Sequence, residues 1–153
     1  MPVFIHAKNI GCYSAITGEL DPISIINEAR RLGKKLFLPV IPAHHKSMTF
    51  YTCQCPLVKN AWNILEPNRS KEKPINIDQL DIIFVPMVGF DEHGNRIGRG
   101  VGYYDRCLSQ AKKETRPVFI GLAYESQQYR GISPDSWDVP MDMIVTEKNL
   151  YSR

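Results

Sequence analysis

The sequence predicts an α/β fold with three layers, in which helices flank a mainly parallel sheet. Short apolar runs alternate with amphipathic stretches along the 153 residues, as in proteins built from βαβ units. Residues 82–85 read Ile-Ile-Phe-Val, a continuous apolar run typical of a strand buried on both faces. Hydrophobic residues make up 43% of the chain and charged residues 23%, so we expect one globular domain over residues 1–153.

The first helix is predicted by its caps and its spacing. Asp21 offers an N-cap and Pro22 suits a first helical position. Gly33 supplies a stop at the other end. Between them, apolar residues recur at helical spacing: Ile23, Ile26, Ala29 and Leu32.

Apolar runs predict the strands of the sheet. Pro39 and Pro42 are expected to close the second strand, because proline cannot donate to a ladder. The polar stretch 66–74 contains two prolines and is expected to be a loop, and residues 104–113 are expected to form a second helix. The predicted strands cover residues 10–16, 36–41, 48–53, 80–86, 118–123 and 143–146.

Residues 96–106, Arg-Ile-Gly-Arg-Gly-Val-Gly-Tyr-Tyr-Asp-Arg, carry the clearest functional signal. Glycines let backbone N–H groups converge on an anion, arginines offer forked donors to phosphate, and aspartate can hold a divalent cation. The spacing fits neither a P-loop nor a dinucleotide fingerprint, so a mobile connection is the plain alternative. However, its three arginines repel one another unless an anion lies among them, and Tyr103 and Tyr104 are bulky for a linker. We therefore predict a nucleotide-phosphate site, at the carboxyl end of a strand where open sheets bind ligands.

Other polar groups have structural explanations from spacing alone. Residues 90–95 predict a turn, with Glu92 and His93 exposed at its tip. Glu19 is interpreted as a surface carboxylate near the start of the first helix. Asp138 lies in a predicted turn beside Pro140, with a ligand for a nucleotide-borne metal as the functional alternative.

The four cysteines are expected to be reduced structural thiols. Cys53 and Cys55 have no second close pair, and a zinc site needs better-spaced partners. His44 and His45 lie nearby in the sequence, which leaves a metal site as the alternative.

Charge and hydropathy bear on location and partners. The net charge of +3 is too small for the concentrated patch of a nucleic-acid binder, although it suits anionic small molecules. The sequence contains neither the apolar run of about 20 residues needed to span a bilayer nor a signal peptide. We expect a cytoplasmic protein, monomeric or weakly self-associating, without membrane or nucleic-acid partners.

Residues 86–91 and 94–106 resemble the signature of the 5-formyltetrahydrofolate cyclo-ligase family, also called methenyltetrahydrofolate synthetases. Shorter stretches that resemble the family lie at 13–21, 33–39, 48–50, 66–67, 138–142 and 145–147. The resemblance implies a fold shared with ribose-5-phosphate isomerase and CoA transferases. It also implies a reaction of one-carbon metabolism, the ATP- and Mg²⁺-dependent conversion of 5-formyltetrahydrofolate to 5,10-methenyltetrahydrofolate, with release of ADP and phosphate.

The resemblance also implies roles for individual residues. Asp105 and Asp138 would bind Mg²⁺, and Glu19 and Ser14 would contact the folate. Tyr104 would lie near the reacting formyl group and, with Arg99, would be catalytic. Replacing Arg99 or Asp105 by alanine is expected to abolish turnover and leave the fold intact. The residues that would contact ATP are Arg96, Ile97, Gly98, Arg99, Gly100, Val101, Gly102, Tyr103 and Tyr104.

Family members usually carry a further N-terminal helical segment that contributes a lysine and an arginine to the ATP phosphates. Here only a short lead-in precedes the strand near Ile10, so either the true start lies further upstream or the domain is N-terminally short by nature. In the second case we expect weaker ATP binding and a partly uncovered core. A non-catalytic folate- or nucleotide-binding protein is therefore the alternative function. An RNA-binding module, suggested by the arginines and tyrosines of the loop, is a weaker one.

Overall fold

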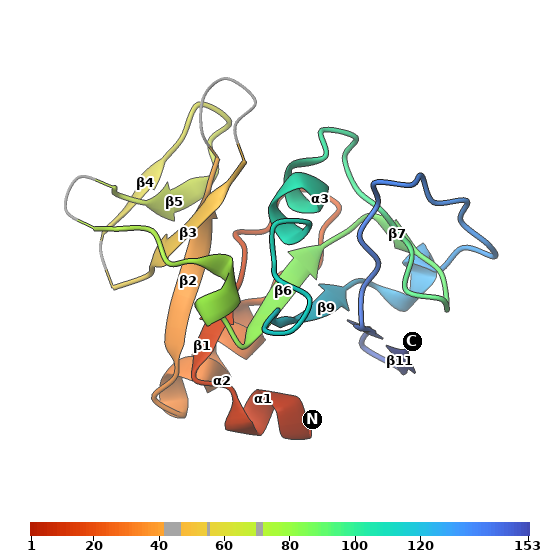
Figure 1. Ribbon diagram of the computed structural model, residues 1–153, viewed down its shortest axis with the longest axis horizontal. Coiled ribbons are helices and arrows are strands. Elements are labelled where there is room, and N and C mark those ends of the chain that lie inside the picture. The colour runs from red at the N-terminus through yellow and green to blue at the C-terminus, as the bar shows by residue number, and fades with distance from the viewer. Residues whose placement is uncertain (42–46, 55, 70–71) are drawn as a thin grey trace.

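The structure, a computed structural model, describes residues 1–41, 47–54, 56–69 and 72–153. Its centre is a seven-stranded sheet with the strand order β11-β10-β9-β6-β1-β2-β3 (Figure 1). The inner strands are parallel, whereas β3 pairs antiparallel with β2 and β11 pairs antiparallel with β10. The strands are β1 (Asn9–Gly11), β2 (Lys35–Val40), β3 (Thr49–Thr52), β6 (Ile82–Pro86), β9 (Val118–Leu122), β10 (Met143–Val145) and β11 (Leu150–Ser152). The predicted α/β class and mainly parallel sheet are thus confirmed.

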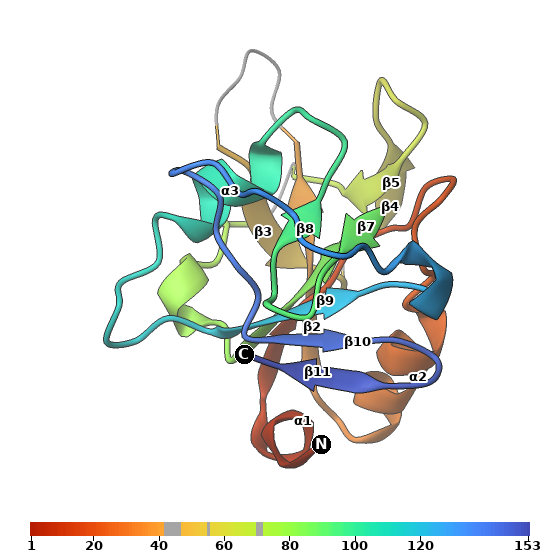
Figure 2. The ribbon, with the colours of Figure 1, turned by 90° about the vertical axis from the view of Figure 1, so that its right-hand side faces the viewer.

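Helices cover both faces of this sheet, which makes the three layers. Helices α1 (Pro2–His6) and α2 (Ile23–Arg31) lie on one face, and α3 (Tyr103–Leu108) lies on the other (Figures 1 and 2). Two apolar clusters fill the layers between them. One contains Ala29 of α2 with Ile10 and Phe84, and the other contains Cys107 and Leu108 of α3.

Helix α2 lies where its caps predict, although it begins at Ile23, with Pro22 rather than Asp21 at the N-cap position. The Asp21 carboxylate accepts a hydrogen bond from the Ile23 N–H at 3.0 Å, and the Pro22 carbonyl accepts the Ile26 N–H at 3.0 Å. After the helix, Gly33 has a φ of +68°, the left-handed conformation that glycine adopts without steric cost. Local sequence therefore determines both ends of this helix.

Residues 2–6, expected only as a lead-in, form helix α1. Val3 and Phe4 pack on the cluster beneath the sheet, and the Phe4 and Phe84 rings lie 6.3 Å apart between centroids. Lys34 closes the end of the helix, because its ammonium donates to the carbonyls of Ile5 at 2.8 Å and Ala7 at 2.7 Å. Helix α1 therefore covers this part of the core.

Two hairpins stand apart from the main sheet and were missed. They are β4 (Leu57–Lys59) with β5 (Leu65–Pro67), and β7 (Gly89–Phe90) with β8 (Arg96–Ile97). The sequence predicted a loop at residues 66–67, because the stretch 66–74 is polar and contains two prolines. The strand there was missed because strands this short carry little periodicity. The predicted turn at 90–95 is confirmed. Its side chains Glu92 and His93 are 70% and 72% exposed, whereas the Asp91 carboxylate is buried and accepts the N–H groups of His93 and Asn95.

Three boundaries differ from the predictions. The first strand ends at Gly11, after which the chain leaves the sheet. Pro39 lies inside β2, where its missing N–H is tolerated because the pairing of β2 with β1 stops at Phe37. The second long helix ends at Leu108 rather than at residue 113. Short 3₁₀ helices occupy Ile77–Gln79 and Glu125–Gln127.

Two of the described cysteines behave as structural thiols. Cys12 and Cys107 are buried free thiols, and Cys53 is half-buried. Burial raises the pKa of Cys12 to about 12 and that of Cys107 to about 11, so neither supplies a reactive thiolate. The described part of the chain does not include Pro42, His44, His45 or Cys55. Within the described part, no cluster of three metal-ligating side chains occurs.

Among the described helices, none has the length and apolar character needed to cross a membrane.

Candidate active site

A cavity of about 1290 Å³ opens where the strand order of the sheet reverses direction. From β1 the chain moves outward to β2 on one side and later to β6 and β9 on the other. Ligands in open α/β proteins bind at such a switch, beyond the carboxyl ends of the strands. Residues that follow β1, including Tyr13, Ser14 and Glu19, and residues at the end of β6, including Met87, line this cavity.

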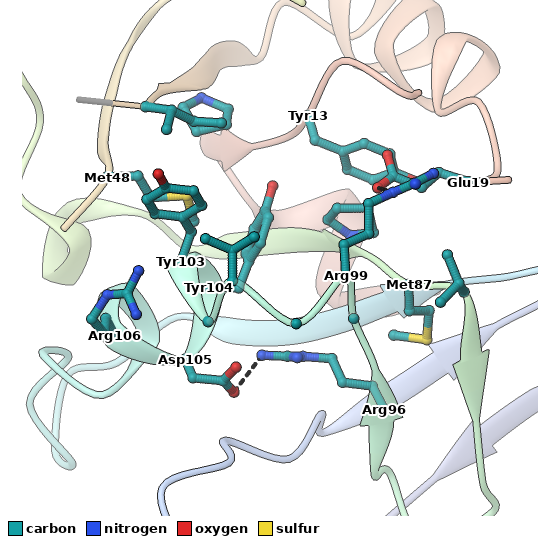
Figure 3. Close-up of a pocket in the computed structure, with 18 of the residues that line it drawn as sticks. Tyr13, Glu19, Met48, Met87, Arg96, Arg99, Tyr103, Tyr104, Asp105 and Arg106 are labelled. Atoms are coloured by element: carbon teal, nitrogen blue, oxygen red, sulfur yellow. Dashed lines mark hydrogen bonds and ion pairs between the residues drawn. The ribbon is translucent and has the colours of Figure 1, made fainter. Parts of the chain in front are cut away.

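The glycine-rich segment connects β8 to α3 and crosses the middle of Figure 3, with side chains on both sides of it. Gly100 and Gly102 have φ values of +80° and +69°, so the chain turns there as L-residues rarely can. The N–H groups of Gly98 to Val101 make no hydrogen bond to another described residue. A row of open backbone donors at an exposed loop is suited to bind an anion.

Arg96 and Asp105 meet on one side of this segment (Figure 3). Arg96 Nη2 lies 2.5 Å from Asp105 Oδ1, and the two side chains are only 7% and 13% exposed. The same carboxylate oxygen accepts the Val139 N–H at 3.1 Å. Asp105 thus ties the glycine-rich loop to the C-terminal segment, a structural duty that sequence reasoning did not foresee.

Arg99 extends to the other side of the loop, toward Glu19 and Tyr13 (Figure 3). Its Nε lies 3.5 Å from Glu19 Oε1, and its Nη2 donates to the carbonyl of Thr17. These contacts join residues 80 positions apart in the chain. The structure therefore brings together the strongest predicted site residue and a carboxylate that spacing alone assigned to the surface.

Glu19 belongs to the cavity wall rather than to the surface. Its side chain is 9% exposed, and its Oε2 accepts the Ile16 N–H at 3.1 Å. Burial raises the pKa of Glu19 above its ordinary value, although the Ile16 N–H and the Arg99 guanidinium oppose the rise. A carboxyl whose pKa is raised by burial in a cleft is typical of a functional site.

Tyr103 and Tyr104 project from α3 to the same side of the loop as Arg99 (Figure 3). Burial raises the pKa of Tyr104 well above its ordinary value, so its hydroxyl stays protonated and can donate a hydrogen bond. The Arg106 guanidinium lies 5.2 Å from the centre of the Tyr103 ring, a cation–π contact. Both tyrosines therefore line the cavity, and the Tyr104 hydroxyl can also donate a hydrogen bond to a ligand.

The predicted metal ligands approach each other along one wall. Asp138 immediately precedes Val139, whose N–H binds Asp105, and both aspartates line the cavity. Asp138 Oδ2 accepts the Asp135 N–H at 2.8 Å, and Asp105 Oδ1 is occupied as described above. Each carboxylate keeps a second oxygen with no hydrogen bond from a described residue. This donor set fits Mg²⁺, which takes one or two carboxylates and fills its other positions with water and phosphate.

Sequence reasoning missed part of the rim. Asn60, Trp62 and Leu65, from the β4–β5 hairpin, line the cavity, as does Trp137. Both tryptophans are more than half exposed, at 55% and 68%, which is unusual for so large an apolar side chain. The polar surroundings of Trp62 in the sequence contained the signal, because an isolated tryptophan between turn residues has no helix or strand face to bury it.

Comparisons with known proteins agree with this site. The sequence model of the 5-formyltetrahydrofolate cyclo-ligase family matches residues 1–147. The chain is 34% identical to the 5-formyltetrahydrofolate cyclo-ligase of Haemophilus influenzae, over 92% of its own length and 76% of the relative's. It is 32% identical to the Escherichia coli K12 enzyme of the same name, over 98% and 84% of the two lengths.

A solved structure shows the same fold. The 5,10-methenyltetrahydrofolate synthetase of Aquifex aeolicus superimposes with a TM-score of 0.82 at 34% identity, covering 99% of this chain and 75% of that one. The family match and the relatives' names confirm the predicted family and cyclo-ligase activity, with folate and ATP as the substrates that the family implies. This chain, with its Gly-rich loop between Arg96 and Asp105 and its cavity at the β1–β6 switch, belongs to the 5-formyltetrahydrofolate cyclo-ligase family.

Proposed function

We propose that this cavity cyclises 5-formyltetrahydrofolate to 5,10-methenyltetrahydrofolate and releases ADP and phosphate. The observation that carries the proposal is the meeting of Glu19 and Arg99 in one cavity of about 1290 Å³. The glycine-rich loop follows β8 and suits the phosphates of one substrate, whereas the buried Glu19 carboxylate follows β1 and can bind a second substrate at the same time. The volume exceeds that of a typical single-ligand pocket, roughly 300–1,000 Å³.

ATP is proposed to lie along the glycine-rich loop, residues 96–104. The open N–H groups of Gly98 to Val101 and the Arg99 guanidinium suit its phosphate oxygens. Arg96 contributes least directly, because its guanidinium is buried and already paired with Asp105. Its chief effect on the nucleotide is to hold Asp105 and the loop in place.

The folate is proposed to bind between the segment after β1 and Tyr104. A buried carboxylate such as Glu19 accepts hydrogen bonds from the N–H groups of a pterin ring. Ser14 lines the same wall, and its hydroxyl donates to the Leu65 carbonyl at 2.7 Å, so its oxygen can still accept a hydrogen bond from the folate. Tyr104 is proposed to donate to the formyl group as it reacts.

The reaction needs activation of a formamide oxygen, which is a poor leaving group. Transfer of the γ-phosphoryl group from ATP to that oxygen breaks the bond to ADP and forms a phosphate ester. N10 of the folate then attacks the formyl carbon and closes the ring, and phosphate leaves together with the N10 proton, which passes to solvent. Arg99 stabilises the charge on the transferring group and Tyr104 orients its acceptor, so the protein acts by positioning and electrostatics.

Asp105 and Asp138 are the residues proposed to hold Mg²⁺, through the carboxylate oxygens that remain open. When bound, the cation neutralises charge on the phosphate oxygens. Asp105 contributes a fixed position, because two further hydrogen bonds orient its carboxylate. Asp138 contributes from a turn stabilised by the Asp135 N–H.

The test is turnover by the purified chain with ATP, Mg²⁺ and 5-formyltetrahydrofolate. We expect the methenyl product, followed by absorbance, to appear together with one released phosphate per product. Arg99→Ala should lower kcat by about 100-fold or more, as expected for removal of a donor to the transferring group. Arg31→Ala is the matched control, because this arginine is 68% exposed on α2 and its ion-pair partner among the residues that the structure describes is Glu28.

Binding of both ligands without phosphate release would contradict the proposal and support a non-catalytic folate- or nucleotide-binding protein.

We further propose that the domain, residues 1–153, acts as a cytoplasmic monomer or weak homo-oligomer without nucleic-acid or membrane partners. The small net charge of +3 supports the preference for small anionic substrates. Sedimentation across a concentration series would test the state of association.

A further inference from the structure

Arg96 and Arg99 are directed to opposite sides of the glycine-rich loop (Figure 3). Arg96 is buried against Asp105, whereas Arg99 is 44% exposed and reaches across to the segment after β1. There it donates to the Thr17 carbonyl and faces Glu19. In this position the donors of Arg99 are engaged with protein acceptors, although the proposed reaction needs them on a phosphate.

The acceptors that hold Arg99 are themselves firmly placed. Residues 16–19 form a turn in which the Glu19 N–H donates to the Ile16 carbonyl at 3.0 Å, and the Glu19 carboxylate accepts the Ile16 N–H. Gly18 gives the turn its φ of +87°, and its carbonyl accepts Gln127 Nε2 at 2.8 Å. We call residues 16–19 the arginine dock. It presents a carbonyl and a buried carboxylate to one guanidinium.

The loop that carries Arg99 has freedom that the dock lacks. Arg99 stands between Gly98 and Gly100, and a side chain added at Gly100 would meet nothing within 4 Å. Residues 97–101 are exposed. The contacts of Arg99 with the dock are therefore the ones that decide where its guanidinium lies, and they can be exchanged without unfolding any element.

We propose that Glu19 is a positioning residue for Arg99, which it holds on the dock until the folate takes over the Glu19 carboxylate. Release of Arg99 then lets the guanidinium turn to the nucleotide phosphates. Binding of the folate and of the nucleotide is consequently coupled, each tightening the other by the same factor. The inference rests on the proposed function, because it assigns the two ligands to the two sides of the cavity.

The coupling is modest, because Arg99 is partly exposed and exposed ion pairs contribute little. Pairs of this kind correspond to about a two- to five-fold change in affinity. Glu19→Gln removes the charge that attracts Arg99 and keeps an oxygen that can accept the Ile16 N–H. The variant should therefore bind nucleotide alone about two- to five-fold more tightly than the wild type.

The experiment is calorimetric titration with the non-hydrolysable analogue AMP-PNP and Mg²⁺, with and without 5-formyltetrahydrofolate. In the wild type, the folate should tighten AMP-PNP binding, and in Glu19→Gln this effect should shrink toward one-fold. In an Arg99→Ala background, Glu19→Gln should change AMP-PNP affinity no further. Glu92→Gln is the matched control, since this glutamate is 70% exposed on the β7–β8 turn, outside the residues that line the cavity, and its replacement should leave the affinity for AMP-PNP unchanged.

Two results would overturn the inference. If Glu19 only contacts the folate, Glu19→Gln leaves the affinity for AMP-PNP alone unchanged. If the docked position is the one that binds phosphate, the variant binds AMP-PNP more weakly. Failure of the wild type to bind AMP-PNP would instead contradict the proposed function itself, and circular dichroism of each variant verifies that it is folded.

Discussion

Arg96 Nη2 lies 2.5 Å from Asp105 Oδ1, in a pair that water barely reaches. Arg96 Nε is also buried and has no hydrogen-bond partner among the described residues. The pair lies beneath the glycine-rich loop and binds the backbone of Val139 as well. Because removing one partner leaves a buried charge uncompensated, the pair makes the glycine-rich loop and the C-terminal segment depend on each other.

The first prediction concerns stability at this pair. Asp105→Ala should lower the free energy of unfolding by about 3–5 kcal/mol, because Arg96 loses its counter-charge and Val139 its acceptor. This prediction replaces the sequence-based expectation that the variant keeps its fold intact, because the pair is only 7% and 13% exposed. Urea denaturation of the purified variants measures the change.

Asp138→Ala is the matched control for that experiment. Its carboxylate also lines the cavity, but it accepts one backbone hydrogen bond and is only half-buried, so the loss should be about 1 kcal/mol. The double variant Arg96→Met with Asp105→Leu should regain much of the stability that Asp105→Ala loses. Equal stability of Asp105→Ala and Asp138→Ala would show that the pair has no structural role.

The second prediction compares two glycines with left-handed backbone. Gly94 and Gly131 have φ values of +84° and +74°, so alanine is strained at either, by about 1–2 kcal/mol. A Cβ at Gly94 would lie 2.5 Å from the Met141 carbonyl oxygen, whereas at Gly131 it would meet nothing within 4 Å. Gly94→Ala should therefore destabilise the protein by about 1–3 kcal/mol more than Gly131→Ala.

Thermal unfolding of the two glycine variants side by side measures this difference. The backbone pair behind it is the Met141 N–H, which donates to the Gly94 carbonyl at 2.9 Å and brings the C-terminal segment against the β7–β8 turn. If both variants melt at the same temperature, the close approach of Gly94 to Met141 is not present in solution.

The third prediction follows from the raised pKa of Glu19. Burial is its cause, so the folded protein favours the protonated carboxyl more than the unfolded chain does. Stability from this group is then present below the ordinary pKa of about 4.3 and is lost as pH rises through the higher folded-state pKa. Glu19→Gln, which cannot ionise, should melt above the wild type at pH 8 and at the same temperature at pH 4.

Glu92→Gln serves as the comparison for Glu19→Gln, since its side chain is 70% exposed and should leave the melting temperature unchanged at either pH. A melting temperature of Glu19→Gln at or below that of the wild type at pH 8 would refute the prediction. The expected outcome would mean that the cavity retains an ionised carboxylate at a cost in stability, as functional sites commonly do.

The fourth prediction has the opposite sign and concerns Asp142. Burial raises the pKa of Asp142, but the Arg116 guanidinium, at 2.6 and 2.7 Å, and the Phe119 N–H outweigh it, so the pKa is lowered overall. The stability it contributes is present above the ordinary pKa of about 3.9 and is lost as pH falls through the lower folded-state pKa. Asp142→Asn should therefore be less stable than the wild type at pH 7.

Urea denaturation at pH 7 and at pH 3 checks the fourth prediction. The gap between Asp142→Asn and the wild type should narrow at the lower pH. Asp135→Asn, at an exposed position, should show no gap at either pH. A gap for Asp142→Asn that stays constant or widens on acidification would contradict the assignment of this stability to the ionised carboxylate.

Local chemistry predicted well those elements whose signals are local. Asp21 and Gly33 mark the ends of α2, and the apolar run at 82–85 marks the buried strand β6. The strand predicted at residues 10–16 is too long, since β1 ends at Gly11. Apolar character alone does not distinguish a strand from a buried cavity wall. Tyr13 is such a wall residue, since it is 1% exposed and its hydroxyl donates to the Leu20 carbonyl at 2.5 Å.

The sequence by itself determined the mainly parallel α/β architecture and a loop suited to phosphate, because these depend on apolar patterning and short-range spacing. It also indicated the family, because residues 86–91 and 94–106 resemble the family's signature. Only the tertiary structure decided that Arg96 forms a buried ion pair with Asp105. It also decided that Arg99 contacts Glu19, which lies 80 positions earlier in the sequence. The physical reason is the strand order. Parallel pairing of Ile10 with Ile82 and of Gly11 with Ile83 places the ends of β1 and β6 side by side, and no local pattern encodes that register.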